Sequence, residues 1–221
     1  QFTVEHNREA GTRRPDVVLF VNGLPLAVIE LKNPIDLDTD IWEAFNQLET
    51  CKSQITRLFY YNAALAIADG ADARAGSLTA DRERFLKWRS VDGEVLDPHG
   101  SFGHAQSLIE GLFSKKNLLD VIQYFTIFVS GKKTIKMLPG YHQFYAVTKA
   151  YHRAIQASKE GGDGKGGLMW HTQGSGKSYE MACLAGKLIK SPELKNPTIV
   201  LVTDRNNLDD QLYDTFVAAK A

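Results

Sequence analysis

The sequence has no net charge, because 26 Lys and Arg residues are matched by 26 Asp and Glu residues. This balance excludes a protein that binds a polyanion through its overall charge, so any such contact must come from a local patch. The most basic stretch, residues 131–170, holds seven Lys or Arg residues. A solvated helix face followed by a linker explains that stretch equally well, and both interpretations stay open.

Cysteine is scarce, and long apolar runs are absent. Cys51 and Cys183 are the 2 cysteines, and neither has companions at metal-ligand spacing. We therefore expect a reducing, cytoplasmic compartment and no disulfide framework. No apolar run approaches the roughly 20 residues of a membrane helix, so no membrane association is expected. No signal peptide is visible, and the chain opens at Gln1 rather than Met, so we expect residues to precede it.

The first half of the chain predicts a strand–helix–strand unit. Residues 16–21 form an apolar run, Asn22-Gly23 is a hairpin signal, and residues 26–31 form the returning strand. A helix follows, and its apolar stripe predicts a buried face. The members of that stripe are Ile41, Phe45, Leu48, Ile55 and Leu58. Residues 63–68 are the next strand candidate, which favours a mixed sheet with a crossover helix.

The second half predicts the opening of a nucleotide-binding α/β domain. After two expected helices (residues 106–113 and 117–129), residues 131–133 mark a boundary and residues 161–167 form a glycine-rich loop. The order strand, loop, helix, strand then follows, as in a nucleotide-binding α/β fold. Its predicted elements are residues 168–170, 177–190 and 198–203.

Two carboxylates and one lysine are expected on one face of the hairpin. If the loop contains three residues, Asn22 to Leu24, paired positions sum to 46, and Asp16 lies opposite Glu30. Lys32 is two residues beyond Glu30 and points to the same face. A two-residue turn would instead give a sum of 45 and place the carboxylates on opposite faces. We therefore predict the longer loop.

This arrangement suits a metal-dependent hydrolytic site. Two carboxylates match the preference of Mg²⁺ for oxygen ligands, and the metal would orient a scissile phosphate and generate the attacking hydroxide. Lys32 would counter charge at the phosphate or position the water. The alternative is an ordinary exposed pair of Glu30 and Lys32 on a solvated face. Against it, the charges lie within apolar strands, where burial without a partner is costly.

Residues 14–33 closely resemble the nuclease domain of type I restriction enzyme R (restriction or motor) subunits, which belongs to the PD-(D/E)xK nuclease family. The resemblance implies that Asp16 and Glu30 bind Mg²⁺ and that Lys32 is the catalytic lysine. The family also places a Gln-x-x-x-Tyr motif on the following helix. Gln47 matches its first position and is implied to act in catalysis, whereas Cys51 occupies the tyrosine position. A solvent-facing Gln47 is the alternative interpretation.

A phosphate-binding loop follows at residues 171–178, which fit the Walker A pattern except that His171 replaces the leading glycine. Backbone N–H groups would wrap a phosphate at a helix N-terminus. Lys177 would neutralise the β- and γ-phosphates, and the Ser178 hydroxyl would bind Mg²⁺. A glycine-rich helix start without nucleotide is the alternative. The predicted ATP-binding residues of the loop are Thr172, Gly174, Ser175, Gly176, Lys177 and Ser178.

The departure at His171 is shared with superfamily 2 helicases and with type I R subunits, which the loop resembles. Residues 140–143 resemble the segment upstream of that loop, which implies that Gln143 reads adenine. Residues 202–211 resemble helicase motif Ia, which contacts the DNA backbone. No acidic Walker B segment or second motor lobe is visible, so we expect both beyond Ala221.

The resemblance implies an α/β chain in two parts. Residues 1–130 would form a PD-(D/E)xK nuclease with a mixed sheet and flanking helices, and residues 131–221 the start of a RecA-like P-loop domain. The implied protein is the R subunit of a type I restriction-modification enzyme. It would translocate double-stranded DNA with ATP and use Mg²⁺ to cut unmodified DNA away from the recognition site. Methyltransferase (modification) and specificity subunits would be its partners.

Two other functions remain open. One is a different nuclease–helicase fusion, such as a repair or type III-like enzyme, which would not depend on the same partner subunits. The other is a DNA translocase that does not cut, in which a silent nuclease fold serves as a docking module. Loss of Mg²⁺ affinity on replacing Asp16 would separate a nuclease from a docking module.

Overall fold

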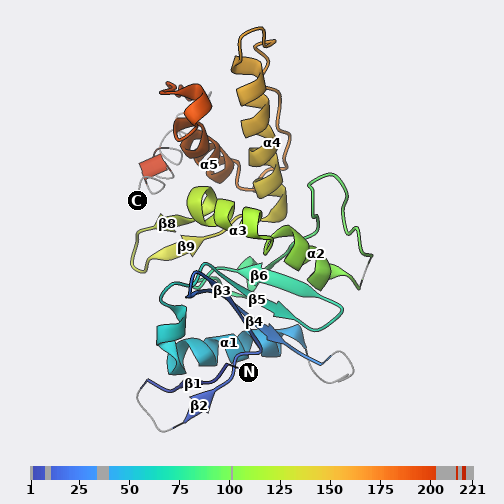
Figure 1. The fold of residues 1–221 in the computed structure, drawn as a ribbon, viewed down its shortest axis with the longest axis vertical. Helices are drawn as coiled ribbons and strands as arrows, with labels where there is room; N and C mark the ends of the chain where they lie inside the picture. The colour runs from blue at the N-terminus through green and yellow to red at the C-terminus, as the bar shows by residue number, and fades with distance from the viewer. Residues whose placement is uncertain are drawn as a thin grey trace. The chain divides into compact units, whose positions relative to one another are not determined.

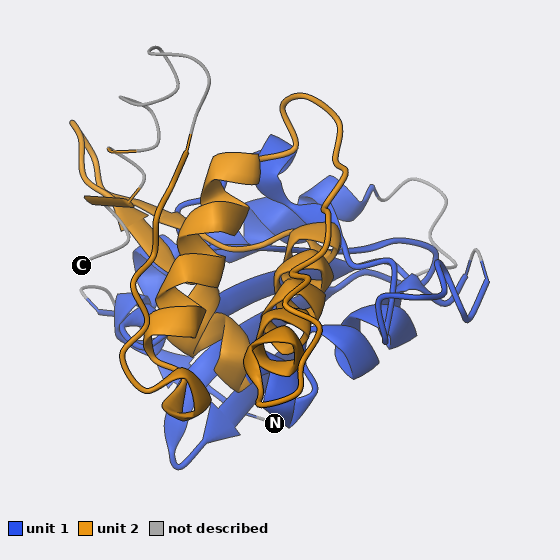
Figure 2. Ribbon diagram, turned by 90° about the horizontal axis from the view of Figure 1, so that it is seen from above, with its two compact units in different colours: residues 1–118 blue, residues 119–221 orange. Residues whose placement is uncertain are grey.

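The computed structural model describes residues 2–7, 11–33, 40–100, 102–202, 213, 216 and 217. The chain forms two compact units, residues 1–118 and residues 119–221 (Figure 2). Among the helices of the described ranges, none is both long and apolar enough to cross a membrane. The expected functional boundary after residue 130 stays a prediction.

The first unit is built on a five-stranded mixed sheet in the order β3-β4-β5-β6-β7 (Figure 1). β4 and β5 are parallel, and the other neighbouring strands are antiparallel. Helix α1 connects the parallel pair, because parallel neighbours need a crossover. The predicted α/β fold class is thus confirmed. The elements are β3 (Val17–Val21), β4 (Leu24–Leu31), α1 (Ile41–Gln54), β5 (Ala64–Ala68), β6 (Ala73–Gly76) and β7 (Leu86–Lys87).

The core of this unit lies between α1 and the central strands. All five residues of the predicted apolar stripe are buried, and every residue of β5 is buried as well. Burial of a large aliphatic or aromatic side chain stabilises a fold by about 1.5–3 kcal/mol, so this stripe holds α1 on the sheet. The side chain of Asp40 caps α1 by accepting from Trp42 N at 3.4 Å. The helix ends at Gln54, and Leu58 lies in the short 3-10 helix η1 (Thr56–Phe59).

The predicted three-residue hairpin loop is wrong. Val21 pairs with Leu24, so the loop is the two-residue turn Asn22-Gly23. Both residues have positive φ, at 50° and 81°, as a type I′ turn requires. The register then shifts by one residue after Leu19, where Leu26 is the extra residue of a bulge on β4.

The bulge restores the pairing that the longer loop was meant to supply. Near the turn, paired positions sum to 45, but beyond the bulge Val17 pairs with Ile29, which sums to 46. Continuing that register by one residue places Asp16 opposite Glu30. Asp16 and Glu30 therefore lie opposite each other as predicted. A β-bulge produces this pairing, and not a longer hairpin loop.

The remaining elements of the first unit flank this sheet. A two-stranded ribbon precedes it, and short helices follow it. Residues 82–87 contain a 3-10 turn followed by the edge strand β7. The elements are β1 (Val4–Glu5), β2 (Thr12–Arg13), η2 (Arg82–Arg84), α2 (His104–Gly111) and α3 (Lys115–Asp120), which ends just inside the second unit.

The second unit packs α4 against α5 around buried aromatic side chains. Phe125 and Phe144 lie 4.9 Å apart between ring centroids, and the Tyr179 hydroxyl donates to the Phe125 carbonyl oxygen. Lys187 is buried on α5, and its ammonium lies 2.8 Å from Asp120 Oδ2. The elements are η3 (Val121–Phe125), β8 (Ile127–Val129), β9 (Ile135–Met137), α4 (Tyr141–Ser158), α5 (Lys177–Ile189) and η4 (Pro192–Leu194).

Two predicted strands of this half are wrong, and one predicted helix is too long. The helix expected over residues 117–129 is helical through Phe125, in α3 and η3, and ends before the strand β8, which pairs with β9. Residues 168–170 and 198–202 belong to no strand, and Trp170 is 84% exposed. A parallel strand is stable only with neighbours that satisfy its backbone groups, and no described strand pairs with either segment.

Candidate functional site

Asp16 and Glu30 meet at the end of β3 and β4 that lies away from the hairpin turn. The Leu31 backbone N–H donates to Asp16 Oδ2 at 2.8 Å, which holds the Asp16 carboxylate beside β4. Asp16 is exposed, whereas Glu30 is fully buried on a strand that has a neighbour on each side. One carboxylate thus faces solvent and the other lies beneath it.

Glu30 occupies an environment that disfavours an isolated negative charge. Burial, and then the neighbouring Asp16, raise the pKa of Glu30 to about 8, while Lys32 lowers it. Its Oε2 accepts a hydrogen bond, but Oε1 is buried and has no partner among the described residues. An orphaned buried carboxylate oxygen beside a second carboxylate fits a divalent cation, because a cation would satisfy both.

Gln47 connects Glu30 to Lys32. Its Nε2 donates to Glu30 Oε2 at 2.8 Å, and its Oε1 accepts from Lys32 Nζ at 3.3 Å. The Lys32 ammonium also lies 3.9 Å from Glu43 Oε2, on the first turn of α1. The structure therefore brings together all four predicted residues of this site, and their chemical roles stay predictions. Glu43 was not predicted as a member of this site, and its sequence signal is that of an acidic residue in the first turn of a helix.

Cys51 lies one helical turn beyond Gln47, at the position where the resembling family has tyrosine. Its side chain is buried. Burial, and then the Glu30 carboxylate, raise the pKa of the Cys51 thiol to about 11. The thiol is therefore protonated at neutral pH in the metal-free protein and is not a thiolate nucleophile.

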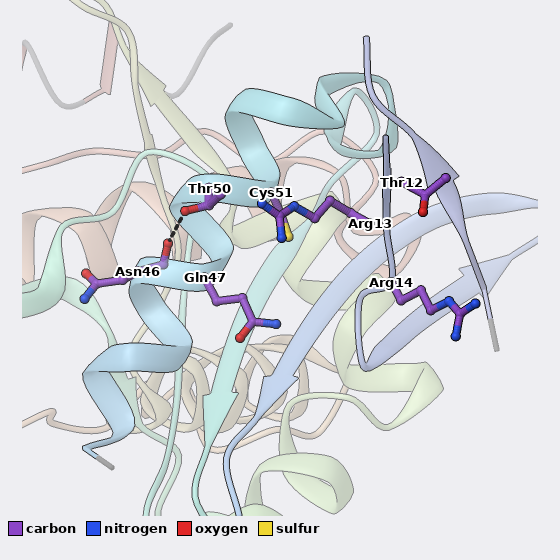
Figure 3. Close-up of a pocket in the computed structure, with 7 residues that line it drawn as sticks. All are labelled: Thr12, Arg13, Arg14, Asn46, Gln47, Thr50 and Cys51. Carbon is purple, nitrogen blue, oxygen red and sulfur yellow. Dashed lines mark hydrogen bonds between the residues drawn. The ribbon is translucent and has the colours of Figure 1, made fainter. Parts of the chain in front are cut away.

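A pocket of about 680 Å³ opens between α1 and the segment that leads into β3 (Figure 3). Gln47 belongs to both this pocket and the carboxylate site, whereas Asp16 and Glu30 do not line the pocket. Arg13 and Arg14 line this pocket and were not among the predicted site residues. Their sequence signal is their position immediately before Pro15 and Asp16. The lining residues are Thr12, Arg13, Arg14, Asn46, Gln47, Thr50 and Cys51.

The predicted phosphate loop forms at the start of α5. Gly174 and Gly176 have φ values of 80° and 85°, which a residue with a side chain rarely adopts. The Lys177 ammonium donates to the carbonyl oxygens of His171 at 3.0 Å and Thr172 at 2.7 Å. It would exchange these oxygens for phosphate oxygens on binding a nucleotide. Ser178 follows in the first turn of α5.

Gln143 lies against this loop. Its Nε2 donates to the Ser175 carbonyl oxygen at 2.7 Å, and its Oε1 accepts from Gly140 N at 2.8 Å. A Cβ atom added at Gly176 would lie 2.4 Å from Gln143 Nε2. The amide therefore ties the start of α4 to the phosphate loop, and its contact with adenine stays a prediction.

His171, the unusual first residue of the loop, is fixed by a glutamate that the sequence interpretation missed. Its Nδ1 lies 2.7 Å from Glu180 Oε1, and Glu180 is buried on the first turn of α5. Burial, and then the neighbouring His171, lower the pKa of His142. A histidine in place of the leading glycine is thus held by a specific partner on the following helix.

The segment that resembles helicase motif Ia is almost entirely undescribed. Residues 203–211 of that segment lie outside the described residues. Within the described ranges, no group of three or more His, Cys, Asp or Glu side chains is arranged to hold a metal ion. The carboxylate site contains two such groups, which is compatible with Mg²⁺ because that ion retains several waters.

Comparison with known proteins relates both halves of the chain to one kind of protein. Residues 1–84 match the family model for the type I restriction enzyme R protein N terminus, and residues 142–221 match that for the SWI2/SNF2 ATPase. The type I restriction enzyme HindI endonuclease subunit of Haemophilus influenzae is 52% identical over 217 residues, which cover 97% of this chain and 21% of that protein.

Two further relatives agree. A putative type I restriction enzyme MjaIXP endonuclease subunit of Methanocaldococcus jannaschii is 38% identical over 235 residues, covering 98% of this chain and 22% of the relative. The type I restriction enzyme SauCOLORF180P endonuclease subunit of Staphylococcus aureus is 29% identical over 226 residues, with 98% and 21% coverage. The chain spans about a fifth of the length of these relatives.

Proposed function

Because this chain matches the N-terminal portion of type I restriction R subunits, we propose that its protein is the R subunit of a type I restriction-modification enzyme. It translocates double-stranded DNA at the expense of ATP and cuts unmodified DNA away from the recognition site in the presence of Mg²⁺. The observation that carries the proposal is the buried Glu30 beside Asp16, with an orphaned oxygen and a bridging glutamine.

The nuclease chemistry follows from the positions of four side chains. Asp16 and Glu30 would hold Mg²⁺, which would supply Lewis-acid activation of the scissile phosphate and of water. Gln47 keeps Glu30 Oε2 and Lys32 Nζ in fixed positions. Lys32 brings a positive charge to the same face and compensates the charge that develops on the phosphate.

The motor chemistry begins at the phosphate loop. Lys177 neutralises the phosphates of ATP, Ser178 contributes its hydroxyl to Mg²⁺, and the N–H groups from Gly174 onward surround the phosphate. Gln143 links α4 to the loop, so the start of that helix responds to nucleotide. The proposed partners are double-stranded DNA and the methyltransferase and specificity subunits of the same complex, in the cytoplasm.

Cleavage of unmodified circular duplex DNA tests the proposal. The full-length protein is assembled with methyltransferase and specificity subunits and assayed with and without ATP, beside Glu30→Ala and Lys177→Ala. We expect cutting that requires ATP and partners and is lost in both variants. Cutting without ATP or partners would instead indicate an autonomous nuclease. ATP turnover without cutting would indicate a translocase with a silent nuclease fold.

Measuring the Mg²⁺ affinity of Asp16 variants distinguishes an active nuclease from a nuclease fold that serves only as a docking module. Asp16→Ala removes one proposed ligand but also the acceptor of the Leu31 N–H at the edge of β3. We therefore expect Asp16→Asn, which keeps an acceptor oxygen, to lose Mg²⁺ affinity as well. Unchanged affinity in both variants would favour the docking module.

A further inference from the structure

The pocket beside the carboxylates has the composition of an anion site. Two arginines come from the segment that leads into β3, and hydroxyl, amide and thiol side chains complete the lining, with no carboxylate among the lining residues (Figure 3). Thr12 lies on β2 and Thr50 on α1, where its hydroxyl donates to the Asn46 carbonyl oxygen at 3.0 Å (Figure 3). Such a lining disfavours a cation, because it carries the positive charge of two arginines and no carboxylate.

Arg13 is held in place within this pocket. Its side chain reaches toward α1, where its Nε donates to Gln54 Oε1. A guanidinium has five N–H donors in a rigid fork, so fixing the Nε edge orients the terminal edge without exhausting its donors. The backbone also restrains this residue, because β2 pairs with β1 and Arg13 lies opposite Val4. The arginine is therefore preorganised to receive an anion.

The pocket adjoins the site proposed to cut DNA. Gln47 lines the pocket and at the same time donates to Glu30 Oε2. Arg14 lines it too, and only Pro15 separates this residue from Asp16. A volume of about 680 Å³ exceeds that of one phosphate group and admits a nucleotide unit. An anion in the pocket would thus be a near neighbour of the phosphate held at Asp16 and Glu30.

We propose that this pocket binds a phosphodiester group of DNA, namely the one next to the scissile phosphodiester on the same strand. Arg13 is the positioning residue for this group. The inference rests on the proposed nuclease function. Two neighbouring phosphates held at once, one by the carboxylate site and one by Arg13, fix the direction of the strand across the active site. Orientation of this kind accelerates a reaction without any contact between Arg13 and the reacting atoms.

The test compares arginine variants in the assembled, full-length enzyme. Single-turnover DNA cutting and ATP turnover are measured for Arg13→Gln, Arg13→Lys and Arg89→Gln. Arg89 is the control. It follows β7, the edge strand opposite β3, and its side chain pairs with Asp97. For Arg13→Gln we expect cutting to fall about tenfold or more with ATP turnover unchanged, and for Arg13→Lys partial recovery, because lysine keeps the charge but not the fork.

Salt dependence supplies a readout that a merely structural role would not move. Loss of one phosphate contact should reduce the slope of log cutting rate against log salt concentration by about 1 relative to the wild type. Arg13→Gln with an unchanged slope, or a rate equal to that of Arg89→Gln, would overturn the inference. A lower melting temperature accompanied by lost ATP turnover would also overturn it, since the role would then be structural.

Two further arms separate the possible failures and the source of the phosphate. Glu30→Ala reports on the proposed function: if cutting persists in that variant, the function fails and the inference with it. If Glu30→Ala is inactive while Arg13→Gln cuts normally, only the inference fails. Inorganic phosphate is added at constant ionic strength. Inhibition that persists at saturating DNA and that Arg13→Gln abolishes would assign the pocket to a free anion instead of the DNA backbone.

Discussion

Gln47 Nε2 lies 2.8 Å from Glu30 Oε2, so a helix side chain completes the environment of a carboxylate on the central sheet. The same amide accepts from Lys32, and the hydrogen bonds fix its orientation from both sides. Glu30 can then rotate little, and its other oxygen stays available to a metal ion. The first prediction follows from this relationship.

Replacing Gln47 by alanine should slow DNA cutting about 10- to 100-fold, the usual cost of removing a group that orients a metal ligand. ATP turnover should not change, because the phosphate loop belongs to the other unit. Glu49→Ala is the matched control on the same helix, since its exposed side chain pairs with Lys52. Equal cutting by Gln47→Ala and Glu49→Ala would contradict the prediction.

Mg²⁺ affinity should rise with pH up to about 8. The pKa of Glu30 is raised to about 8, so the neutral acid prevails in the folded, metal-free protein at lower pH, yet Mg²⁺ requires the ionised form. Affinity should therefore increase by about tenfold per pH unit below that pKa and then level off. Calorimetric titration at several pH values measures it, and Glu30→Gln should abolish the steep dependence. A flat profile in the wild type would contradict the prediction.

The same raised pKa has a consequence for folding. Ionising Glu30 is harder in the folded protein than in the unfolded chain, so its contribution to stability is present below pH 4.5 and is lost as the pH rises through about 8. In metal-free protein, Glu30→Gln should therefore be less sensitive to this pH range than the wild type. Thermal unfolding with a chelator present, monitored at pH 5.5 and 8.5, measures the difference. Added Mg²⁺ should stabilise the wild type at the higher pH alone.

The hairpin turn should tolerate asparagine but not valine at Gly23. Its φ is 81°, and a Cβ atom there would meet no other atom within 4 Å, so the cost is conformational and not steric. Gly23→Val should reduce the free energy of unfolding by about 1–2 kcal/mol, whereas Gly23→Asn should cost less, because asparagine accepts left-handed backbone. Chemical denaturation compares them. Equal stability of the two variants would show that the turn is not left-handed in solution.

Gly176→Ala should weaken nucleotide binding by about 10- to 100-fold, because left-handed backbone with a side chain costs on the order of 1–3 kcal/mol. The added Cβ would also lie 2.4 Å from Gln143 Nε2 and displace the amide that ties α4 to the loop. Gly186→Ala is the control within α5, because its Cβ would meet no atom within 4 Å. Fluorescent-nucleotide titration measures the affinities, and equal values for the two variants would refute the prediction.

Side-chain periodicity was sufficient to predict how the site residues meet. Alternation on β4 placed Glu30 and Lys32 on one face, and helical spacing placed Gln47 on the side of α1 that faces them. The bulge at Leu26 was not predictable, because it depends on how β4 fits between two neighbours. Glu180 was missed because its pairing with His171 forms only after the loop folds back on α5.

The strands expected at residues 168–170 and 198–203 illustrate a different limit. Their β-branched and aromatic side chains express a local preference, but a strand exists only when partner strands accept its hydrogen bonds. β5 shows the opposite case, because it has a parallel neighbour on one side and an antiparallel neighbour on the other. Local sequence predicts the preference, and the rest of the sheet decides whether it is expressed.

Because of the extra residue in β4, the number of residues between Asp16 and Glu30 decides whether the two carboxylates lie on the same face of the sheet. A tight turn alone would leave Asp16 and Glu30 back to back, and one additional residue turns them face to face. Among natural variants of this hairpin, single insertions or deletions between the two carboxylates should therefore be rare unless a second change restores the count. Paired changes should be tolerated even where the turn itself looks quite different.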